Sequence, residues 1–336
     1  MSVNVAISGF GRIGRLVLRA IFEHNRKDIN VVAVNCSRGD IQSHAHLLKY
    51  DTAHGKFDAE IQTQDDFFVV NGHKIKYLNT RDPKMLPWKE LDVDVVLECT
   101  GAFRGKKSNE FHIEQGARKV LISAPGESDI DATVVYGVNH EILKSSDIFV
   151  SNASCTTNGL APLVKVIQDE LGIKSGLMNT IHSYTNDQSL LDNMHKDIRR
   201  ARAASGSMIP TKTGAASAVG LVIPEVKGKL DGIAVRVPTN NVSLVDLTIV
   251  TEKQTSKDAV NKIMRKASED NLKGILVYND EPLVSVDFNH NSNSAIVDLS
   301  LTSVVGNNMG KVSAWYDNEW GFACRMCDLA NYFGKI

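Results

Sequence analysis

A single cysteine, Cys155, stands among small polar residues in the stretch SNASCTTNG, residues 151–159. Free cysteine usually behaves as a small buried hydrophobe, so packing is the default interpretation. The flanking pattern favours chemistry instead, because an apolar run ends near Ser151 and an amphipathic helix is expected from Asn158 onward. Cys155 is then expected in the first helical turn or just before it, where a helix N-terminus lowers the pKa of a thiol and favours the nucleophilic thiolate.

A cysteine nucleophile needs a base, and position alone does not choose among the ten histidines. The stretch TIHSYTND places His182 at the end of a strongly β-type run that polar residues follow. This pattern is typical of the edge of a sheet, so His182 is a candidate base for Cys155. A histidine that merely packs at that edge is the alternative, and these residues alone leave it open.

The stretch GFGRIG holds Gly9, Gly11 and Gly14 in G-x-G-x-x-G spacing. It follows a short apolar run, Val3–Ser8, and opens a segment with helical periodicity, Arg12–Glu23. In this context the glycines permit a tight turn and let a pyrophosphate approach the helix N-terminus. A turn that only packs tightly is the alternative, but the strand before and the helix after favour a dinucleotide site.

The second expected strand, Val31–Val34, ends without the acid that usually binds the adenosine ribose of NAD. That place is taken by Asn35 or Cys36, and Arg38 is close by. The missing acid removes a barrier to the 2′-phosphate of NADP, and an arginine could pair with that phosphate. Alternatively, Asn35 and the backbone hold an unphosphorylated ribose while Arg38 faces solvent.

The elements around these residues predict two domains. Residues 1–152 alternate between strand and helix patterns, which predicts an α/β fold with a Rossmann-type, doubly wound parallel sheet. Further strands are expected at Val93–Glu98, Lys119–Ile122 and Ala132–Gly137, and Asn71-Gly72 predicts a hairpin turn. β-rich runs over 153–318 predict an α+β catalytic domain with a mainly antiparallel sheet and a helix near Ser256–Ala267. A last helix, 319–336, is expected to pack back onto the first domain.

Composition argues against several functions. The chain has 336 residues, a formal net charge of −1 and no basic block, so a nucleic-acid partner is not expected. No secretory signal is expected, and no apolar run approaches the roughly 18 residues of a membrane span. Five cysteines at low density favour a reducing compartment, hence the cytoplasm. Cys324 and Cys327 form a C-x-x-C without two further zinc ligands, so we expect helical packing and no metal.

Several motifs follow one another along the chain: GFGRIGR, HLLKYDTAHGKF, SNASCTTN, HSYTNDQ, RRARAA, TGAA, RVPT and WYDNEWG. With them the sequence strongly resembles the phosphorylating glyceraldehyde-3-phosphate dehydrogenases over essentially its whole length. The resemblance implies a homotetramer that acts in glycolysis or gluconeogenesis. It implies NAD or NADP as cofactor, and glyceraldehyde 3-phosphate and inorganic phosphate as substrates.

The resemblance also implies roles for the two candidate residues. The thiolate of Cys155 adds to the aldehyde, and His182 activates the thiol and takes the proton as hydride leaves to the nicotinamide. Phosphate then attacks the resulting thioester to give an acyl phosphate. The backbone N–H of Cys155 and the His182 side chain suit the oxyanion of the tetrahedral intermediate.

Two anion sites and a cofactor site are implied in the same way. Residues that match the site for the substrate's phosphate are Thr185, Asp187 and Arg236. Residues that match the inorganic phosphate site, in and around an S-loop of about 183–206, are Ser154, Thr156, Arg200, Thr213 and Gly214. Besides the glycine loop, residues that match the cofactor site are Arg12, Ile13, Arg81, Ser123 and Asn318, the last at the nicotinamide carboxamide.

Three departures from the family pattern bear on function. Members that use NAD usually carry aspartate where this chain has Cys36, and Leu-Pro where it has Asn193-Met194. Because both positions depart from the NAD pattern, we expect the protein to use NADP or both cofactors. Most members have a second cysteine where this chain has Gly159. We expect activity to survive this change, and peroxide oxidation of Cys155 to proceed through sulfenic acid or mixed disulfides.

Three rival functions share parts of this pattern. Erythrose-4-phosphate dehydrogenase shares the cysteine and histidine but departs after the histidine, where HSYTNDQ matches the triose-phosphate enzyme. A non-phosphorylating aldehyde dehydrogenase hydrolyses the thioester with water and lacks the second anion site. A catalytically idle binding or adhesion protein would not need an intact set of Cys155, His182, Arg236 and Asn318.

Overall fold

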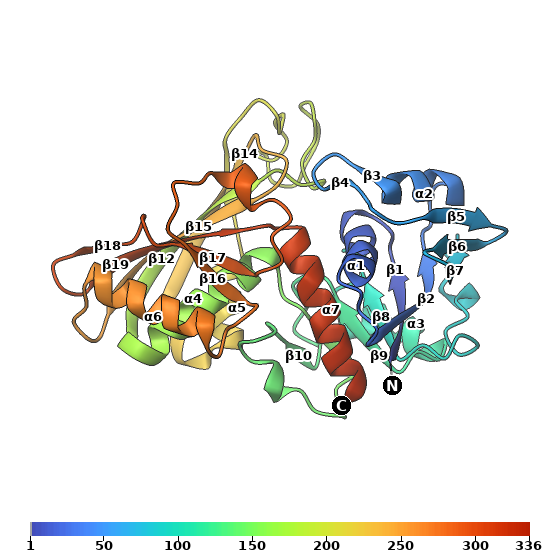
Figure 1. Cartoon of the computed structure of the whole chain (residues 1–336), viewed down its shortest axis with the longest axis horizontal. Coiled ribbons are helices and arrows are strands. Elements are labelled where there is room, and N and C mark those ends of the chain that lie inside the picture. The colour runs from blue at the N-terminus through green and yellow to red at the C-terminus, as the bar shows by residue number, and fades with distance from the viewer. Residues whose placement is uncertain (1) are drawn as a thin grey trace. The chain divides into compact units, whose positions relative to one another are not determined.

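The computed structural model describes residues 2–336, which form two compact units (Figure 1). The first unit extends from the N-terminal strand to Tyr136 and also contains His140–Ala153 and Ala323–Ile336. The second unit contains Gly137–Asn139 and Ser154–Phe322. Each unit is built around a large sheet of its own.

Within residues 2–336, the sheet of the first unit has nine strands in the order β10-β11-β9-β8-β1-β2-β7-β6-β5. The pairs from β10 to β7 are parallel, and β5, β6 and β7 run antiparallel. The strands are β1 (Val3–Ser8), β2 (Ile29–Asn35), β5 (Ile61–Gln64), β6 (Phe67–Val70), β7 (His73–Leu78), β8 (Val95–Glu98), β9 (Lys119–Ile122), β10 (Ala132–Thr133) and β11 (Phe149–Ser151). The helices are α1 (Arg12–Glu23), α2 (Ile41–Lys49) and α3 (Lys106–Glu114), and β3 (Tyr50–Asp51) pairs with β4 (Gly55–Lys56). The expected Rossmann-type parallel sheet is confirmed.

Local sequence signals explain much of this unit. The turn between β6 and β7 has φ 48° at Asn71 and φ 80° at Gly72, and two positive φ values in a row are what the type I′ hairpin turn requires. The strand expected over Ala132–Gly137 is wrong beyond Thr133, because β10 stops there. Val134 and Val135 are fully buried outside the ladder, so this apolar run reflects burial and not strand pairing.

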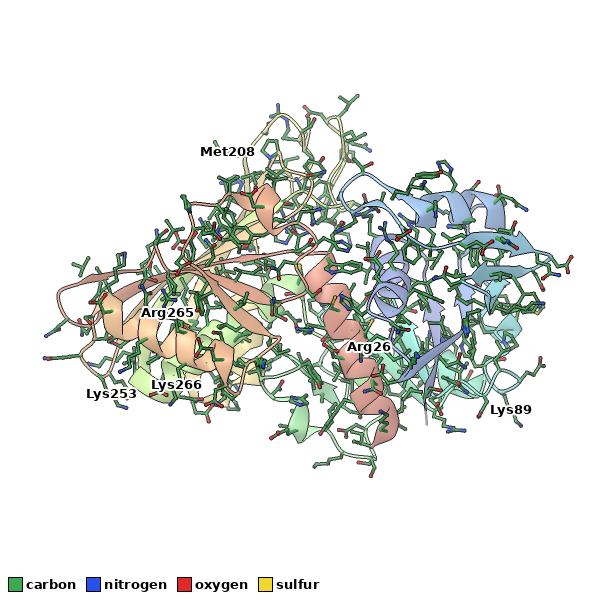
Figure 2. All side chains as sticks on the ribbon, in the orientation of Figure 1. Arg26, Lys89, Met208, Lys253, Arg265 and Lys266 are labelled. Atoms are coloured by element: carbon green, nitrogen blue, oxygen red, sulfur yellow. The ribbon has the colours of Figure 1, made fainter. Side chains whose placement is uncertain are left out.

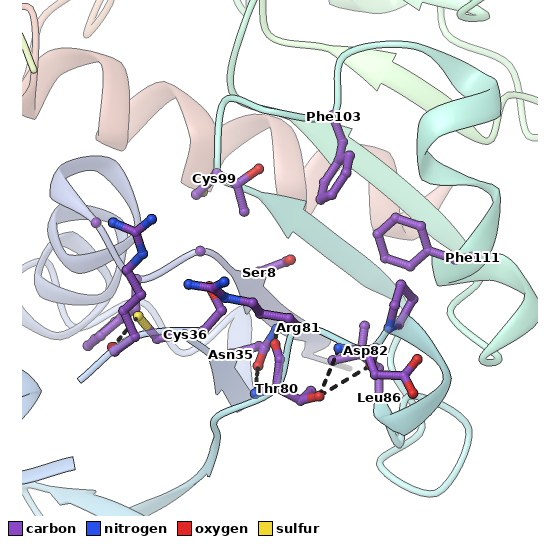
Figure 3. A pocket seen from close by; sticks show the side chains of 17 residues that line it. Ser8, Asn35, Cys36, Thr80, Arg81, Asp82, Leu86, Cys99, Phe103 and Phe111 are labelled. Atoms are coloured by element: carbon purple, nitrogen blue, oxygen red, sulfur yellow. Dashed lines mark hydrogen bonds between the residues drawn. The ribbon is translucent and has the colours of Figure 1, made fainter. Parts of the chain in front are cut away.

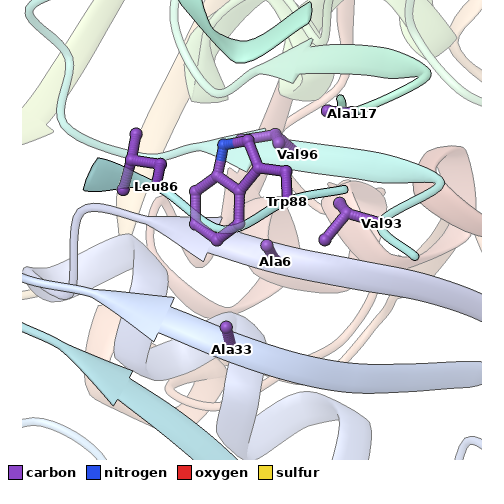
Figure 4. Packing of buried hydrophobic residues seen from close by; sticks show 7 residues of the cluster. All are labelled: Ala6, Ala33, Leu86, Trp88, Val93, Val96 and Ala117. Carbon is purple, nitrogen blue, oxygen red and sulfur yellow. The ribbon is translucent and has the colours of Figure 1, made fainter. Parts of the chain in front are cut away.

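The core of the first unit packs around Trp88, which is fully buried (Figure 4). The buried residues that share its cluster are Ala6, Ala33, Leu86, Val93, Val96 and Ala117. The indole Nε1 donates a hydrogen bond of 3.0 Å to Nδ1 of His112 on α3. This packing supports β1 and β8, whose carboxyl ends carry the glycine loop and Cys99.

The C-terminal helix, α7 (Trp320–Lys335), contributes Ala323–Ile336 to the first unit. Lys119 Nζ donates to the carbonyl oxygens of Phe333 and Ile336, each at 2.9 Å. Arg26, labelled in Figure 2, forms an ion pair of 2.6 Å with Asp328. These contacts fasten the end of the chain to the unit that begins it.

The second unit has, within the described residues, an eight-stranded sheet in the order β13-β14-β12-β15-β19-β17-β16, with β18 paired to β19. Its strands are β12 (Ile173–Ser183), β13 (Ile209–Lys212), β14 (Leu230–Val237), β15 (Ser243–Thr251), β16 (Leu276–Asn279), β17 (Ala295–Asp298), β18 (Ser303–Val305) and β19 (Met309–Tyr316). The helices α4 (Cys155–Leu171), α5 (Ala215–Val222) and α6 (Lys257–Glu269) pack together, and α4 contacts β12, β15, β17 and β19. Only β12–β14 and β16–β17 are parallel pairs, so the expectation of a mainly antiparallel sheet is confirmed.

No helix among residues 2–336 combines the length and apolar character that a membrane-spanning segment needs.

Candidate active site

Cys155 is the first residue of α4, in the second unit. Ser154 is the N-cap, and its Oγ accepts a hydrogen bond of 3.0 Å from the Thr157 N–H. Ala153, directly before the cap, has φ 56°, which is a left-handed conformation that costs a residue with a Cβ about 1–3 kcal/mol. The strained residue and the cap together fix the thiol at the start of the helix.

The sheet brings His182 to this thiol. His182 is the penultimate residue of β12 and pairs in register with Arg236 on the parallel strand β14. Its Nε2 lies 3.5 Å from the Sγ of Cys155, and its side chain is buried. The two residues selected from the sequence as nucleophile and base therefore lie within contact of each other.

Hydrogen bonds on the far side of the imidazole define its tautomer. Nδ1 of His182 lies 2.6 Å from the carbonyl oxygen of Ser183. Arg236 Nη1 lies 2.8 Å from that nitrogen and 3.0 Å from the same oxygen. The oxygen can accept from both donors, whereas a protonated Nδ1 cannot accept from arginine. Protonation at Nδ1 fits this geometry, and it leaves the Nε2 lone pair facing Cys155.

The electrostatics favour a neutral pair. Burial, followed by the positive charge of Arg236, lowers the pKa of His182 to about 3. Burial also raises the pKa of the Cys155 thiol, although the charge of Arg236 opposes that rise. The expectation of a low thiol pKa at this helix N-terminus is therefore wrong for this site, because desolvation outweighs the charge of Arg236 and the hydrogen bonds of Thr156. Both directions favour the uncharged thiol and the uncharged imidazole.

Tyr316 forms the buried wall behind the pair. Its hydroxyl bonds to Thr156 Oγ1 at 3.0 Å and to Thr180 Oγ1 at 2.8 Å. Its ring meets the imidazole of His182 edge-on, with centroids 6.0 Å apart. Thr156, expected at the inorganic phosphate site, thus directs its hydroxyl to this wall. Tyr316 belongs to the WYDNEWG motif, whereas Thr180 is in no motif, because its role depends on strand register.

The residues expected to bind the two phosphates do not form two separate groups in the structure. Arg236 Nη1 lies 3.4 Å from Thr185 Oγ1, which places these two beside His182. Arg200 instead forms an ion pair with Asp187, although the resemblance assigns the two to different phosphates. Arg200 Nε also donates to Thr211 Oγ1 at 2.9 Å. Its guanidinium is therefore already held by an acid and a hydroxyl of the same unit.

The remaining expected residues of the second unit lie at element ends. Gly214 is the N-cap of α5, and Thr213 Oγ1 accepts from the Ala215 N–H at 3.2 Å. The buried Asn318 accepts a hydrogen bond of 2.8 Å from Ser243 Oγ, which in turn accepts one of 3.1 Å from the Ser183 N–H. Ser243 is a residue that sequence reasoning missed. Its contacts link Asn318 to the strand that carries His182.

In the first unit, the glycine loop has the geometry that the motif predicted. Gly9 has φ 93°, and a Cβ there would meet the Thr100 backbone nitrogen at 2.7 Å. A Cβ at Gly14 would lie 2.1 Å from the Gly9 oxygen, so this glycine permits helix and strand to pack. A Cβ at Gly11 would meet nothing within 4 Å. Gly11 therefore leaves open space at the N-cap of α1, where a pyrophosphate would approach.

A cavity of about 620 Å³ adjoins this loop (Figure 3). The residues expected at the cofactor that line it are Gly9, Gly11, Asn35, Cys36, Arg38 and Arg81. The Asn35 amide pairs with the backbone of Thr80 through two bonds of 3.2 Å, so this side chain is already engaged in joining β2 to the loop after β7. Arg38 and Arg81 are exposed, and neither guanidinium has a hydrogen-bond partner in the described part of the chain.

The other expected cofactor residues lie near the same edge of the sheet. Arg12, in the first turn of α1, forms an ion pair with Asp51 and donates to its Oδ1 at 3.2 Å. Ile13 follows it and is half-buried. Ser123 directly follows β9 and contacts the Cys99 thiol. Among residues 2–336, no three His, Cys, Asp or Glu side chains gather as metal ligands would.

A Rossmann-type unit, together with a second unit that contains a thiol–imidazole pair, indicates an oxidoreductase with a dinucleotide cofactor. Residues 3–106 match the family model for the glyceraldehyde 3-phosphate dehydrogenase NAD-binding domain, and residues 154–318 match that for the C-terminal domain. The chain belongs to the glyceraldehyde-3-phosphate dehydrogenase family.

Curated relatives agree over the full length. The chain is 59% identical over 331 residues to the chromosomal glyceraldehyde-3-phosphate dehydrogenase of Cupriavidus necator, covering 98% of each chain. It is 54% identical over 336 residues to the Xanthobacter flavus enzyme, covering all of both chains. It is 51% identical to glyceraldehyde-3-phosphate dehydrogenase 2 of Bacillus subtilis, covering 99% of this chain and 97% of the relative.

Proposed function

We propose that this protein catalyses the phosphorylating oxidation of D-glyceraldehyde 3-phosphate to 1,3-bisphosphoglycerate with reduction of NAD or NADP. The observation that carries the proposal is the contact between Cys155 Sγ and His182 Nε2 at 3.5 Å, with Arg236 on the far side of the imidazole. The relatives named glyceraldehyde-3-phosphate dehydrogenase, at 51–59% identity, support the same substrate.

The neutral pair suggests how Cys155 begins the reaction. As the sulfur adds to the aldehyde carbon, its proton passes to the Nε2 lone pair of His182, so the thiolate need not exist beforehand. The imidazolium and the backbone N–H of Cys155 then stabilise the oxyanion of the thiohemiacetal. Bound nicotinamide supplies the hydride acceptor. The imidazolium returns its proton to the oxyanion, which becomes the hydroxyl, and His182 takes that proton back as hydride leaves and the thioester forms. Phosphate attack on the thioester then expels the sulfur as a thiolate, which the imidazolium protonates.

Two positive side chains support binding of the two phosphates. Arg236, with Thr185 beside it, is proposed to hold the phosphate of the substrate, since a guanidinium and a hydroxyl suit phosphate oxygens. Arg200 is proposed to hold the attacking phosphate, with Ser154, Thr213 and the start of α5 nearby in the family pattern. Asp187 must then share Arg200 with that phosphate or release it.

The cavity of the first unit fits a dinucleotide, and its charge supports NADP or dual use. Arg38 and Arg81 line it with exposed guanidinium groups. Asp82 also lines it, but its carboxylate accepts a hydrogen bond from the Lys84 N–H and caps a short helical turn. No acid follows β2 where it would repel a 2′-phosphate. We propose that Arg38 or Arg81 pairs with that phosphate when NADP binds.

The test is a steady-state assay of kcat/KM with NAD and with NADP, with and without phosphate. Turnover of glyceraldehyde 3-phosphate that depends on phosphate supports the proposal, and phosphate-independent turnover contradicts it. Erythrose 4-phosphate in parallel tests the nearest rival. We expect Cys155→Ser to lower kcat at least about a thousandfold, while Cys36→Ser keeps kcat. A strong preference for NAD would overturn the NADP proposal alone.

We also propose a homotetramer and a cytoplasmic location. Side chains of Leu190, Leu191 and Met194, in the S-loop of about 183–206, are strongly exposed in the single chain. All five cysteines are free thiols, as a reducing compartment favours. Light scattering coupled to size-exclusion chromatography gives the mass, and a monomer at micromolar concentration would contradict the tetramer.

A further inference from the structure

Two cysteines outside the thiol–imidazole site share the cavity of the first unit. Cys36 directly follows β2 and Cys99 directly follows β8, the two strands on either side of β1. Both side chains are half-buried and line the cavity of about 620 Å³ (Figure 3). The reaction proposed above uses neither thiol.

The surroundings of Cys36 are those of a reactive thiol. Its Sγ lies 3.3 Å from the carbonyl oxygen of Arg38, and the Nε2 of His44 lies 2.7 Å from the same oxygen. The thiol of Cys36 and the imidazole of His44 thus contact the same carbonyl oxygen, just before α2 begins. Only 7% of His44 is exposed, and its ring lies against Phe10 and Tyr77 at centroid distances of 5.8 and 6.0 Å.

The carbonyl oxygen of Arg38 accepts from the neutral thiol, whereas the neighbouring His44 favours negative charge on the sulfur. Burial alone raises the pKa of Cys36, but the hydrogen bond from His44 and the backbone of Arg38 and Phe10 outweigh it, so the pKa lies below its ordinary value. The pKa of His44 is raised, chiefly by its hydrogen bond to Cys36, although the charge of Arg15 opposes this. An imidazole next to a thiol, with these two directions of shift, is an arrangement that activates cysteines.

Cys99 provides an internal comparison. Burial and the charge of Glu98 raise the pKa of its thiol, and the contact with Ser123 compensates only in part. Cys99 is therefore a second thiol in the same cavity whose surroundings disfavour the thiolate.

We propose that Cys36 is a covalent modification site inside the dinucleotide cavity, reactive toward small electrophiles and low-molecular-weight disulfides, and that its adduct and the bound dinucleotide exclude each other. The inference rests on NAD occupying this cavity, which the match of residues 3–106 to an NAD-binding domain supports. It does not depend on the reaction proposed for Cys155.

The chemistry balances in both cases. With iodoacetamide, the Cys36 sulfur forms a bond to carbon, the carbon–iodine bond breaks, iodide leaves and the thiol proton goes to water. With a small disulfide, the sulfur attacks one sulfur of the reagent, the reagent's S–S bond breaks, and its other half leaves as a thiolate. The reagent is the oxidant: its leaving half is reduced to a thiolate as Cys36 is oxidised to the mixed disulfide.

The first test maps iodoacetamide labelling by peptide mass spectrometry on full-length Cys155→Ser protein at pH 7.5, with and without saturating NAD. We expect Cys36 to react at least about ten times faster than Cys99, since one unit of pKa changes the thiolate fraction about tenfold. NAD should slow labelling of Cys36 at least about tenfold. Equal labelling rates for the two cysteines without NAD, or labelling of Cys36 that NAD leaves unchanged, overturns the proposal.

The second test asks whether His44 makes Cys36 reactive, or whether access of the reagent to the thiol alone explains its labelling rate. His44→Gln should slow labelling of Cys36 several-fold and leave Cys99 unchanged, and an unchanged Cys36 rate overturns the role of His44. Calorimetric titration with NAD should then show at least about tenfold weaker binding to the Cys36 adduct. In Cys36→Ser,Cys155→Ser protein, NAD affinity measured before and after treatment with the same reagent should be the same. Because these readouts need no turnover, their failure is distinguishable from failure of the proposed dehydrogenase activity.

Discussion

The ring of Tyr316 closes the space beside Gly159: a Cβ at position 159 would lie 3.1 Å from the Cγ of Tyr316. Gly159 is buried in the second turn of α4. The tyrosine cannot easily move away, because its hydroxyl is held by Thr156 and Thr180. Residue 159 and the tyrosine wall therefore constrain each other.

Gly159→Ala should destabilise the protein despite the better helix propensity of alanine. Alanine gains up to about 1 kcal/mol in a helix interior, but overpacking against a fixed ring costs about 1–3 kcal/mol. Urea unfolding measures the difference. The same substitution in a Tyr316→Phe background should cost less, since the ring is no longer anchored. An increase in stability for Gly159→Ala alone would contradict this picture.

Tyr316→Phe removes two hydrogen bonds and leaves two buried threonine hydroxyls short of a partner. We expect the free energy of unfolding to fall by about 1–3 kcal/mol. Thr180→Val in the same chain removes one of those hydroxyls, so the double variant should lose less than the sum of the single variants. Strictly additive losses would show that the 2.8 Å contact between Thr180 and Tyr316 contributes nothing to stability.

His182 should make stability depend on pH. Its folded pKa is lowered from 6.5 to about 3, chiefly by burial. Between these values the unfolded chain binds a proton that the folded chain does not, so stability is full above pH 6.5 and falls as the pH drops, by up to about 1.4 kcal/mol per pH unit. Relative to His182→Asn, the parent should lose about 2 kcal/mol between pH 7 and pH 5 in urea unfolding. His46→Asn, at an exposed position, is the control, and parallel curves for parent and His182→Asn would refute the assignment.

Arg236 should set both substrate affinity and the pKa of His182. Its guanidinium is the largest cause of the lowered pKa after burial. Arg236→Gln should raise that pKa, visible in a titration of the imidazole resonances by NMR, and should raise KM for the phosphorylated aldehyde. Arg236→Lys keeps the positive charge and should keep most of the pKa shift. If Gln and Lys variants titrate alike, the charge of residue 236 does not control the imidazole.

Peroxide should oxidise Cys155 without an internal disulfide. Cys155 is the only cysteine in the second unit as the structure describes it, and glycine stands at position 159. We expect a sulfenic acid that dimedone traps, or a mixed disulfide with an added thiol. Mass spectrometry of peroxide-treated protein makes the distinction, and a dominant bridge from Cys155 to another cysteine of the chain would contradict the prediction.

The sequence by itself determined the features that depend on neighbours along the chain. The bounds of β1 and α1 match the expected Val3–Ser8 and Arg12–Glu23, since apolar periodicity and the glycine spacing are local signals. The Asn71-Gly72 turn and the place of Cys155 in a first helical turn are local for the same reason. The family resemblance rests on the same short motifs.

Only the tertiary structure decided what each of these residues touches. The parallel register of β12 and β14 sets Arg236 beside His182, and burial raises the pKa of the Cys155 thiol, which was expected to be low. The contact of His44 with Cys36 joins a helix to a strand end. These partners belong to different helices and strands, so no local pattern links them. Desolvation, in turn, depends on everything that packs around a group. Neither register across a sheet nor burial is encoded in any single stretch of residues.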